Sequence, residues 1–169
     1  YKNVKTKVFE NLNFSVNQKS CIGIIGESGS GKTTIVDLLL GLLTPVQGKI
    51  FINDILIKDI SSNLKGEIAY LPQEPIILDE DIKTNIALHS DKNKIDYEKL
   101  NEALIRANLS GVIKKLPANI DTLIGEGGVR LSGGQNKRLA LARAFYHGKN
   151  IVIMDEATSS LDIESENYI

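Results

Sequence analysis

Four residues, Gly26, Gly31, Lys32 and Thr33, match the spacing G-x-x-x-x-G-K-[ST] within the stretch GESGSGKTT. An apolar run precedes this stretch and a helix-forming run follows it, which is the setting that the motif requires. Glycines allow consecutive backbone N–H groups to approach phosphate oxygens, and the start of a helix adds partial positive charge. Lys32 would add a mobile charge at the outer phosphates, and the Thr33 hydroxyl could ligate Mg²⁺. The pattern therefore predicts a nucleotide-binding site.

A second pair of glycines, Gly133 and Gly134, lies in the stretch RLSGGQNKR. Ser132 is well placed as the N-cap of a helix, and Gln135, three residues later, is its expected capping-box partner. Capping explains the serine and the glutamine but not the glycines, each of which costs a helix about 1 kcal/mol relative to alanine. We therefore expect this helix start to be open to the close approach of a second phosphate group.

Two carboxylates, Asp155 and Glu156, follow the apolar run IVIM. A phosphate site that holds Mg²⁺ needs a carboxylate partner at the end of a neighbouring strand, which predicts this role for Asp155. Hydrolysis also needs a group that activates water, and Glu156 is the candidate. Gln73 in YLPQEP could reach the metal or the attacking water, although such a residue on its own is most often an ordinary loop glutamine.

The elements that must position these residues follow from the apolar periodicity. Partial alternation over residues 8–16 predicts one or two strands, and CIGIIG predicts a buried strand. The run KTTIVDLLLGLL predicts a helix that ends before Thr44-Pro45. Apolar runs on both sides of Asn53-Asp54 predict a hairpin. EIAYLPQEP and NIVIMDE each predict one further strand, and we expect the second of these to be buried.

The middle of the chain changes from strands to helices. Residues 97–107 carry apolar side chains at helical spacing, with Asp96 as the expected N-cap. A second helical segment is predicted at 109–116, ended by Pro117, and a third at about 135–146 after a glycine-rich loop. Strands at both ends with helices between them predict an α/β fold with a helical insertion.

Composition limits the class of protein. The chain has 169 residues, of which 42% are hydrophobic and 24% charged, as is typical of one globular domain. The net charge is −1 and the lysines are spread along the chain, so the sequence has no basic cluster of the kind that binds nucleic acid. No apolar run approaches the roughly 20 residues of a membrane helix. The single cysteine excludes a disulfide within the chain.

Taken together, these motifs resemble the ATP-binding cassette (ABC) family, the ATPase domains of ABC transporters. GESGSGKT resembles the Walker A loop, IVIMDE the Walker B strand, and LSGGQ the family signature. Gln73 matches the Q-loop glutamine, and SSLD, which ends at Asp162, matches the D-loop. Tyr1 stands where the family has an aromatic residue that stacks on adenine. The motifs keep the order of the family over essentially the whole chain.

The resemblance implies a fold: an α/β P-loop NTPase core of the RecA type, a small antiparallel β part and an inserted helical subdomain. Residues 1–73 and 149–169 would form the core with the β part, and residues 74–148 the helical subdomain that carries the signature. The family places a histidine that holds the γ-phosphate on a later strand. Because the sequence stops at Ile169, before that strand, we expect residues 1–169 to be a C-terminally incomplete ABC domain.

The resemblance also implies ATP and Mg²⁺ as cofactors. Thr33, Gln73 and Asp155 would hold Mg²⁺ directly or through water, and Glu156, Gln73 and Lys32 would serve catalysis. ABC domains dimerise head to tail, so the signature of one copy closes on the ATP held by the other. The residues expected to contact ATP are Tyr1, Gly26, Ser28, Gly29, Ser30, Gly31, Lys32, Thr33, Thr34, Ser132, Gly133, Gly134, Gln135 and Asp162.

A finer resemblance, carried by PQEPIILDEDIKTNIAL and DTLIGEGGVRLSGGQ, is to the exporter and flippase branch. It implies a second ABC domain and a transmembrane domain, fused or separate, as partners, and no nucleic acid. The domain would then lie at the cytoplasmic face of the cell membrane. Two alternatives stay open: a soluble ABC ATPase that acts on nucleic acid or ribosomes, and a fragment that binds ATP without turnover.

Overall fold

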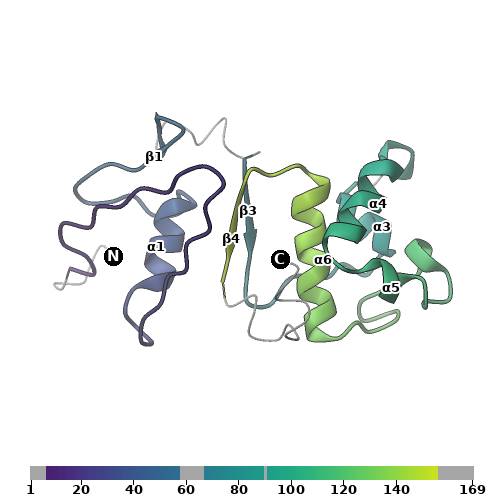
Figure 1. The fold of residues 1–169 in the computed structure, drawn as a ribbon. Coiled ribbons are helices and arrows are strands. Elements are labelled where there is room, and N and C mark those ends of the chain that lie inside the picture. The colour runs from purple at the N-terminus through teal and green to yellow at the C-terminus, as the bar shows by residue number, and fades with distance from the viewer. Residues whose placement is uncertain (1–6, 58–66, 90, 156–169) are drawn as a thin grey trace. The chain divides into compact units, whose positions relative to one another are not determined.

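The structure, a computed structural model, describes residues 7–57, 67–89 and 91–155. The chain forms two compact units, residues 1–65 and residues 66–169 (Figure 1). Both units contain helices and strands, as expected for an α/β protein. None of the helices within the described ranges is both long and apolar enough to cross a membrane.

The first unit contains helix α1 (Lys32–Leu39), which begins directly after the glycine-rich loop. The helix ends earlier than KTTIVDLLLGLL predicts, because Gly41 adopts a left-handed conformation with φ 70°. The N–H of Gly41 donates to the carbonyl of Leu38 at 3.2 Å, and the N–H of Leu42 donates to that of Asp37 at 2.9 Å. This Schellman motif satisfies the last helical carbonyls and stops the helix before the proline is reached.

The predicted hairpin around Asn53-Asp54 is confirmed. Strand β1 (Phe51–Ile52) pairs antiparallel with strand β2 (Ile55–Leu56). Asn53 and Asp54 both have positive φ, 49° and 64°, which is the conformation of a two-residue type I′ turn. Asparagine and aspartate tolerate this conformation because their short polar side chains bond locally to the backbone. The hairpin is the small antiparallel part of the fold.

The strands predicted at residues 8–16 and at CIGIIG are absent from the described residues of the first unit. Ile25 is 95% exposed and Ile24 42% exposed, where burial was expected. A strand forms only when a neighbouring strand exchanges hydrogen bonds with it. The hairpin β1–β2 forms a two-stranded sheet of its own, so this apolar run has irregular backbone here.

The second unit contains two strands that lie far apart in the sequence. Strand β3 (Ile68–Leu71) pairs in parallel with strand β4 (Ile151–Met154) over their full lengths. Both strands were predicted, but β4 is half-buried rather than buried, and Met154 is 38% exposed. Parallel strands are fully buried only when both faces of the sheet are covered. Within this unit, α6 (Gly133–Tyr146) covers one face of the pair (Figure 1).

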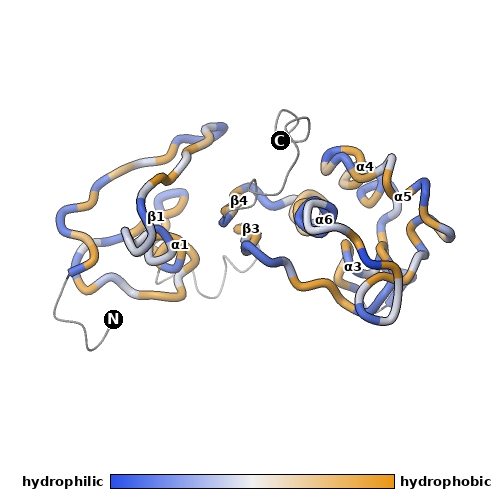
Figure 2. The backbone as a smooth tube through the Cα atoms, turned by 90° about the horizontal axis from the view of Figure 1, so that it is seen from below, coloured by the Kyte–Doolittle hydropathy of each residue, from blue (hydrophilic) through white to orange (hydrophobic). Residues whose placement is uncertain are grey.

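Helix α6 lies between the strand pair and the other helices of the second unit (Figure 1 and Figure 2). On the side of the strands, Leu141 packs in a small buried cluster with Leu71 of β3. On the opposite side, Leu139 and Ala142 pack into the larger cluster of the helical layer. The amino end of α6 lies at the same end of the unit as the carboxyl ends of β3 and β4 (Figure 1).

The helical layer packs on the outer side of α6. Ile82, Ile86 and Leu100 are almost completely buried in it, and each such burial contributes about 1.5–3 kcal/mol. The elements of the layer are α3 (Ile82–Ala87), η2 (Lys92–Lys94), α4 (Tyr97–Arg106), α5 (Ser110–Ile113) and η3 (Asn119–Asp121).

Local signals set where these helices begin and end. The carboxylate of Asp96 accepts hydrogen bonds from the N–H groups of Glu98 and Lys99, so the predicted N-cap of α4 is confirmed. Helix α5 is shorter than the predicted segment 109–116. The N–H groups of Lys115 and Leu116 bond to carbonyls three residues earlier, so the helix has already tightened into turns.

Candidate functional site

The loop before α1 depends on glycine at several positions. Gly29 and Gly31 have φ of 80° and 96°, a left-handed conformation that other residues rarely adopt. A Cβ atom on Gly31 would lie 2.5 Å from Cζ of Phe9, and one on Gly26 would lie 2.7 Å from Oγ of Ser30. A side chain at Gly31 would therefore be strained by the positive φ and would displace the side chains of Val8 and Phe9, whereas one at Gly26 would displace the Ser30 hydroxyl.

Lys32 closes this loop. Its Nζ donates hydrogen bonds to the carbonyl oxygens of Gly26, at 2.8 Å, and of Glu27, at 2.9 Å. The N-cap residue Gly31 provides no side-chain acceptor, so no side chain caps the first turn of α1. Uncapped N–H groups beside an ammonium group form an anion-binding site. The Thr33 side chain is exposed at this end of the helix.

Ser28, Ser30 and Thr34 are the other loop residues that were predicted to contact ATP. Ser28 and Ser30 are exposed, and Thr34 is half-buried. The N–H of Ser30 donates to the carbonyl of Glu27 at 3.2 Å, which closes a tight turn within the loop. The loop thus presents backbone groups and exposed serine hydroxyls, as a phosphate site requires.

In the second unit, Gln73 and Asp155 lie at the carboxyl-terminal end of the strand pair β3–β4. Gln73 follows the end of β3 by two residues, and Asp155 directly follows β4. The carboxyl ends of parallel strands meet at the same end of a sheet, so Gln73 and Asp155 lie at the same end of the pair. The N–H of Asp155 donates to the carbonyl of Leu71 at 2.9 Å, and the hydroxyl of Tyr70 donates to Oδ2 of Asp155 at 3.3 Å. The backbone of Asp155 is therefore held in register with β3.

The start of α6 has the predicted capping box. The N–H of Ser132 donates to Oε1 of Gln135 at 2.8 Å, and the N–H of Gln135 donates to Oγ of Ser132 at 3.3 Å. The helix begins at Gly133, two residues before the predicted start, so Gly133 and Gly134 form its first turn. The hydrogen bonds of the capping box stabilise this first turn and offset the loss of helix stability that the two glycines cause. A Cβ on Gly133 would meet nothing within 4 Å, so this helix start is open.

Tyr1, Glu156 and Asp162 lie outside the described residues. The predicted roles of these three residues stay predictions. The other site residues fall into two groups by unit. The phosphate-binding loop belongs to the first unit, whereas Gln73, Asp155 and the start of α6 belong to the second.

The sequence model of the ABC transporter family matches residues 9–159. The chain belongs to the ABC transporter family. It is 39% identical over 159 residues to an ATP-dependent lipid A-core flippase of Bordetella avium (strain 197N), a match that covers 94% of this chain and 27% of that protein. It is 38% identical over 164 residues to ABC transporter B family member 21 of Arabidopsis thaliana, covering 96% of this chain and 12% of that protein.

A solved structure of a bacterial Atm1-family ABC exporter with ATP bound is also similar to the chain. The TM-score is 0.75 at 33% sequence identity, and the match covers 85% of this chain and 25% of that one. The predicted ABC ATPase fold is thereby confirmed, as is the homology to exporter and flippase members. The chain spans about a quarter or less of the length of these relatives.

The loop geometry fits the nucleotide that ABC proteins bind. The close approach at Gly31, the Lys32 ammonium and the uncapped start of α1 together form a Walker A loop suited to phosphate oxygens. Within the described residues, no three His, Cys, Asp or Glu side chains gather to hold a metal ion. A Mg²⁺ ion in a nucleotide site takes only one or two protein ligands and completes its shell with phosphates and water, so a metal of this kind does not need such a cluster.

Sequence reasoning missed two residues that organise the second unit, Asn85 and Arg143. Asn85 is completely buried in α3, and Arg143 of α6 donates two hydrogen bonds to it, at 2.6 Å and 2.9 Å. A usable signal was present. Asn85 lies three residues after Ile82 and directly before Ile86, at the helical spacing of the apolar residues of α3, and Arg143 interrupts the apolar residues of LALARAFY. A polar residue at an apolar position of a helix indicates a buried hydrogen-bonding partner.

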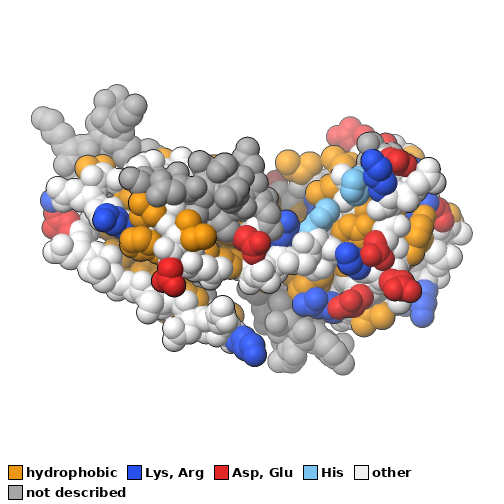
Figure 3. Space-filling model, turned by 90° about the horizontal axis from the view of Figure 1, so that it is seen from above, with side chains coloured by type: hydrophobic (Ala, Val, Ile, Leu, Met, Phe, Trp, Pro, Cys, Tyr) orange, Lys and Arg blue, Asp and Glu red, His pale blue; other side chains and the backbone are white. Residues whose placement is uncertain are grey.

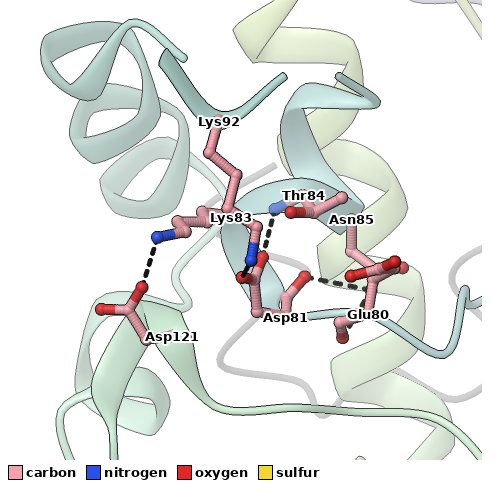
Figure 4. A network of polar contacts seen from close by, with 7 residues as sticks. All are labelled: Glu80, Asp81, Lys83, Thr84, Asn85, Lys92 and Asp121. Carbon is pink, nitrogen blue, oxygen red and sulfur yellow. Dashed lines mark hydrogen bonds and ion pairs between the residues drawn. The ribbon is translucent and has the colours of Figure 1, made fainter. Parts of the chain in front are cut away.

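A buried carboxylate, Asp81, caps α3 (Figure 4). It accepts hydrogen bonds from the N–H of Thr84 at 2.8 Å and from Nζ of Lys92 at 2.7 Å. Burial on its own would raise the pKa of Asp81, but the hydrogen bonds from Lys92 and Thr84 together hold that pKa below its usual value. The stability that Asp81 contributes is therefore present above its unfolded pKa and is lost as the pH falls through the folded pKa.

Asp81→Asn is expected to keep the cap of α3 but to lose the ion pair with Lys92. At pH 7 the free energy of unfolding should fall by about 1 kcal/mol. As the pH falls below about 4 and on through the lowered folded pKa of Asp81, the difference from the unmodified protein should shrink, because Asp81 of the unmodified protein then loses its charge as well. Urea unfolding across this pH range measures both effects. Asp91→Asn, which removes an exposed carboxylate, is the control; a difference for Asp81→Asn that stayed constant with pH would contradict the assignment.

Proposed function

We propose that this chain is an ATP-binding and ATP-hydrolysing domain that powers export or flipping of a substrate by an ABC transporter. The observation that carries the proposal is the Walker A loop, in which Gly31 has a positive φ that favours glycine and Nζ of Lys32 donates hydrogen bonds to the loop carbonyls. The names of the relatives, an ATP-dependent flippase and an exporter with ATP bound, support the same activity.

In this proposal each part of the Walker A loop has a separate task. The backbone N–H groups from Gly29 to Thr34 hold the phosphates, and the nucleotide draws Nζ of Lys32 from the loop carbonyls to its outer phosphates. The Thr33 hydroxyl and Asp155 hold Mg²⁺, which supplies charge neutralisation at the phosphates when it is bound. Tyr1 stacks on the base.

The groups at the carboxyl-terminal end of the strand pair act on water. Glu156 accepts a proton from the attacking water, as a general base does. Gln73 orients that water and reaches the metal. The hydrogen bond from the N–H of Asp155 to the carbonyl of Leu71 supports this division of roles. It holds the end of β4 beside the end of β3, two residues before Gln73.

The signature at the start of α6 acts on a second copy of the domain. Ser132, Gly133, Gly134 and Gln135 contact the γ-phosphate held by the other copy, and Asp162 lies in the same closed dimer. The open start of α6, capped by its own side chains, supports this role. ATP binding closes the head-to-tail dimer, and hydrolysis reopens it.

A transmembrane domain converts this cycle into transport. We propose that the domain works at the cytoplasmic face of the cell membrane with such a partner, fused or separate, and without nucleic acid. On the face shown in Figure 3, acidic and basic side chains of the second unit are interspersed. That pattern does not favour a polyanion such as nucleic acid as the partner of this face.

Steady-state ATP hydrolysis with Mg²⁺, measured over a range of protein concentrations, tests the proposal. Specific activity is expected to rise with concentration, because each site needs the signature of a second copy. Ser132→Arg should abolish activity at every concentration, since a long charged side chain at the start of α6 blocks closure. Specific activity that is independent of concentration and insensitive to Ser132→Arg would contradict the dimer. ATP binding without hydrolysis at any concentration would favour a nucleotide-binding fragment.

A further inference from the structure

A buried asparagine fixes the segment that follows the Q-loop glutamine. Asn85 of α3 is completely buried. Its Nδ2 donates to the carbonyl oxygen of Leu78 at 3.0 Å. It also donates to the carbonyl oxygens of Glu80 and Asp81, at 3.1 and 3.2 Å (Figure 4). Its Oδ1 accepts a hydrogen bond from the N–H of Leu78 at 2.9 Å. One side chain thus holds the backbone of residues 78–81, which has no strand or helix of its own over most of this length.

Arg143 joins this segment to α6, the helix that begins at the signature. Its Nε donates to the carbonyl of Asn85 at 2.6 Å, one terminal nitrogen donates to Oδ1 of Asn85 at 2.9 Å, and the other donates to the carbonyl of Ile76 at 2.7 Å. Burial lowers the pKa of Arg143, but a guanidinium group stays protonated at neutral pH. No ion pair of Arg143 occurs among residues 7–57, 67–89 and 91–155. Its three hydrogen bonds go to neutral oxygens.

The same segment holds the loop that leads to the signature. The N–H of Ile124 donates to the carbonyl of Glu80 at 3.0 Å, and the N–H of Gly127 donates to Oδ1 of Asp79 at 3.2 Å. Gly125 has a φ of 106°, and a Cβ there would overlap the carboxylate of Asp79. Residues 79–80 and 124–127 are therefore packed closely enough to move together.

Gln73 lies midway between two anchored points of the backbone. On one side, Leu71 is buried at the end of β3, and its carbonyl accepts the hydrogen bond from Asp155. On the other side, the carbonyl of Ile76 accepts the hydrogen bond from Arg143. Pro75, directly before Ile76, restricts the backbone of the residue between it and Gln73. The position of Gln73 is therefore set by the strand on one side and by Arg143 on the other.

We infer that Arg143, together with Asn85, is a positioning residue for Gln73 in the hydrolytic reaction. The inference rests on the proposed function, since it assigns a task to the same site. Arg143 touches none of the groups that react. It holds residue 76 against α6, so that Gln73 keeps the position from which it reaches water and metal.

The shape of arginine is needed for this task. Its planar group has five N–H donors in a fixed arrangement and bonds two parts of the chain at once, whereas a lysine ammonium is a single point charge on a flexible stem. Arg143→Met keeps the packing of the stem and removes all three hydrogen bonds. Arg143→Lys keeps the charge and the stem but cannot make the three bonds together, and it remains informative if the methionine variant fails to fold.

The experiment uses the full-length protein and three variants: Arg143→Met, Arg143→Lys and the control Arg106→Met. Arg106 is the last residue of α4, and it contacts α6 through the ring of Phe145, 4.1 Å from its guanidinium carbon. Its ion pair is with Glu102, outside residues 76–81. Each variant is assayed for kcat and KM for ATP and for hydrogen exchange of the backbone amides. The kinetics are repeated with Arg143→Met in a Gln73→Ala background.

Arg143→Met is expected to lower kcat by about 10-fold to 100-fold, the cost of moving a catalytic group by about 1 Å, with little change in KM for ATP. The amides of Leu78 and Ile124 should exchange faster. Arg143→Lys should show the same effects to a smaller degree, and Arg106→Met neither. In the Gln73→Ala background, Arg143→Met should cause little further loss of kcat, because both changes remove the same contribution.

Two results would overturn the inference. One is an unchanged kcat in both Arg143 variants, and the other is an equal loss of kcat whether or not Gln73 is present. Failure of the proposed function looks different, because the unmodified protein would then hydrolyse no ATP. In that case hydrogen exchange still reports on the anchoring: unchanged exchange at Leu78 in Arg143→Met would show that Arg143 does not hold this segment.

Discussion

Glu156→Gln is expected to keep ATP binding and to slow turnover by about 10²-fold to 10⁴-fold, the usual contribution of a general base. A glutamine has the size of glutamate but cannot take a proton from water. Glu156 directly follows Asp155, the last described residue. The N–H of Asp155 donates to the carbonyl of Leu71, so the chain stays paired with β3 as far as Asp155. Steady-state hydrolysis, together with the affinity for a fluorescent ATP analogue, measures both parts of the prediction.

Glu98→Gln is the matched control for this prediction. Glu98 is an exposed glutamate in the first turn of α4, away from the nucleotide motifs in the sequence. Its replacement removes the same charge and should leave both binding and turnover unchanged. Turnover that is unchanged in Glu156→Gln would show that another group activates the water. Loss of ATP binding in that variant would show that Glu156 acts on binding rather than on the chemical step.

Lys32→Ala is expected to weaken ATP binding by about 10-fold to 100-fold and to abolish hydrolysis. The free energy behind this estimate is that of one hydrogen bond to a charged group, about 1.5–3 kcal/mol. In the structure Nζ of Lys32 is held by the carbonyls of Gly26 and Glu27, so the ammonium already lies at the loop before any phosphate arrives. Titration with labelled ATP measures the affinity.

Lys49→Ala separates the specific effect of Lys32 from a general loss of charge. Lys49 is an exposed lysine of the same unit, outside the Walker A loop. Its loss should not change ATP affinity. Equal affinity of Lys32→Ala and the unmodified protein would contradict the assignment of the loop as the phosphate site. A thermal unfolding measurement on both variants excludes the alternative that loss of the two carbonyl contacts simply unfolds the first unit.

The predictions that proved right depend on groups close together in the sequence. Ser132 and Gln135 complete their capping box across three residues, and Asp96 caps α4 across the same distance. The turn at Asn53-Asp54 follows from the two residues that form it. Such features need no knowledge of the rest of the molecule, because the donor, the acceptor and the backbone between them are all specified by a few adjacent residues.

The strand predicted at CIGIIG shows where local patterns fail. An apolar, β-branched run states only that a segment suits a pleated, buried surface. Whether it forms a strand depends on a partner that can come from anywhere in the chain. EIAYLPQEP has such a partner, because β3 pairs with β4 from the far end of the sequence. Ile24 and Ile25 have none among the described residues of their unit, and their side chains are exposed.

The sequence by itself determined the motifs on which the proposed chemistry rests: a glycine-rich loop with its lysine, two carboxylates after an apolar run, and a capped glycine pair, in the order of the ABC family. Each is a short motif whose function follows from a few neighbouring residues. Only the tertiary structure decided that Gln73 and Asp155 share one edge of a sheet, and that Arg143 and Asn85 anchor the segment beyond Gln73. These contacts join residues far apart in the chain, and burial, which makes an unpaired polar group costly, is what selects them.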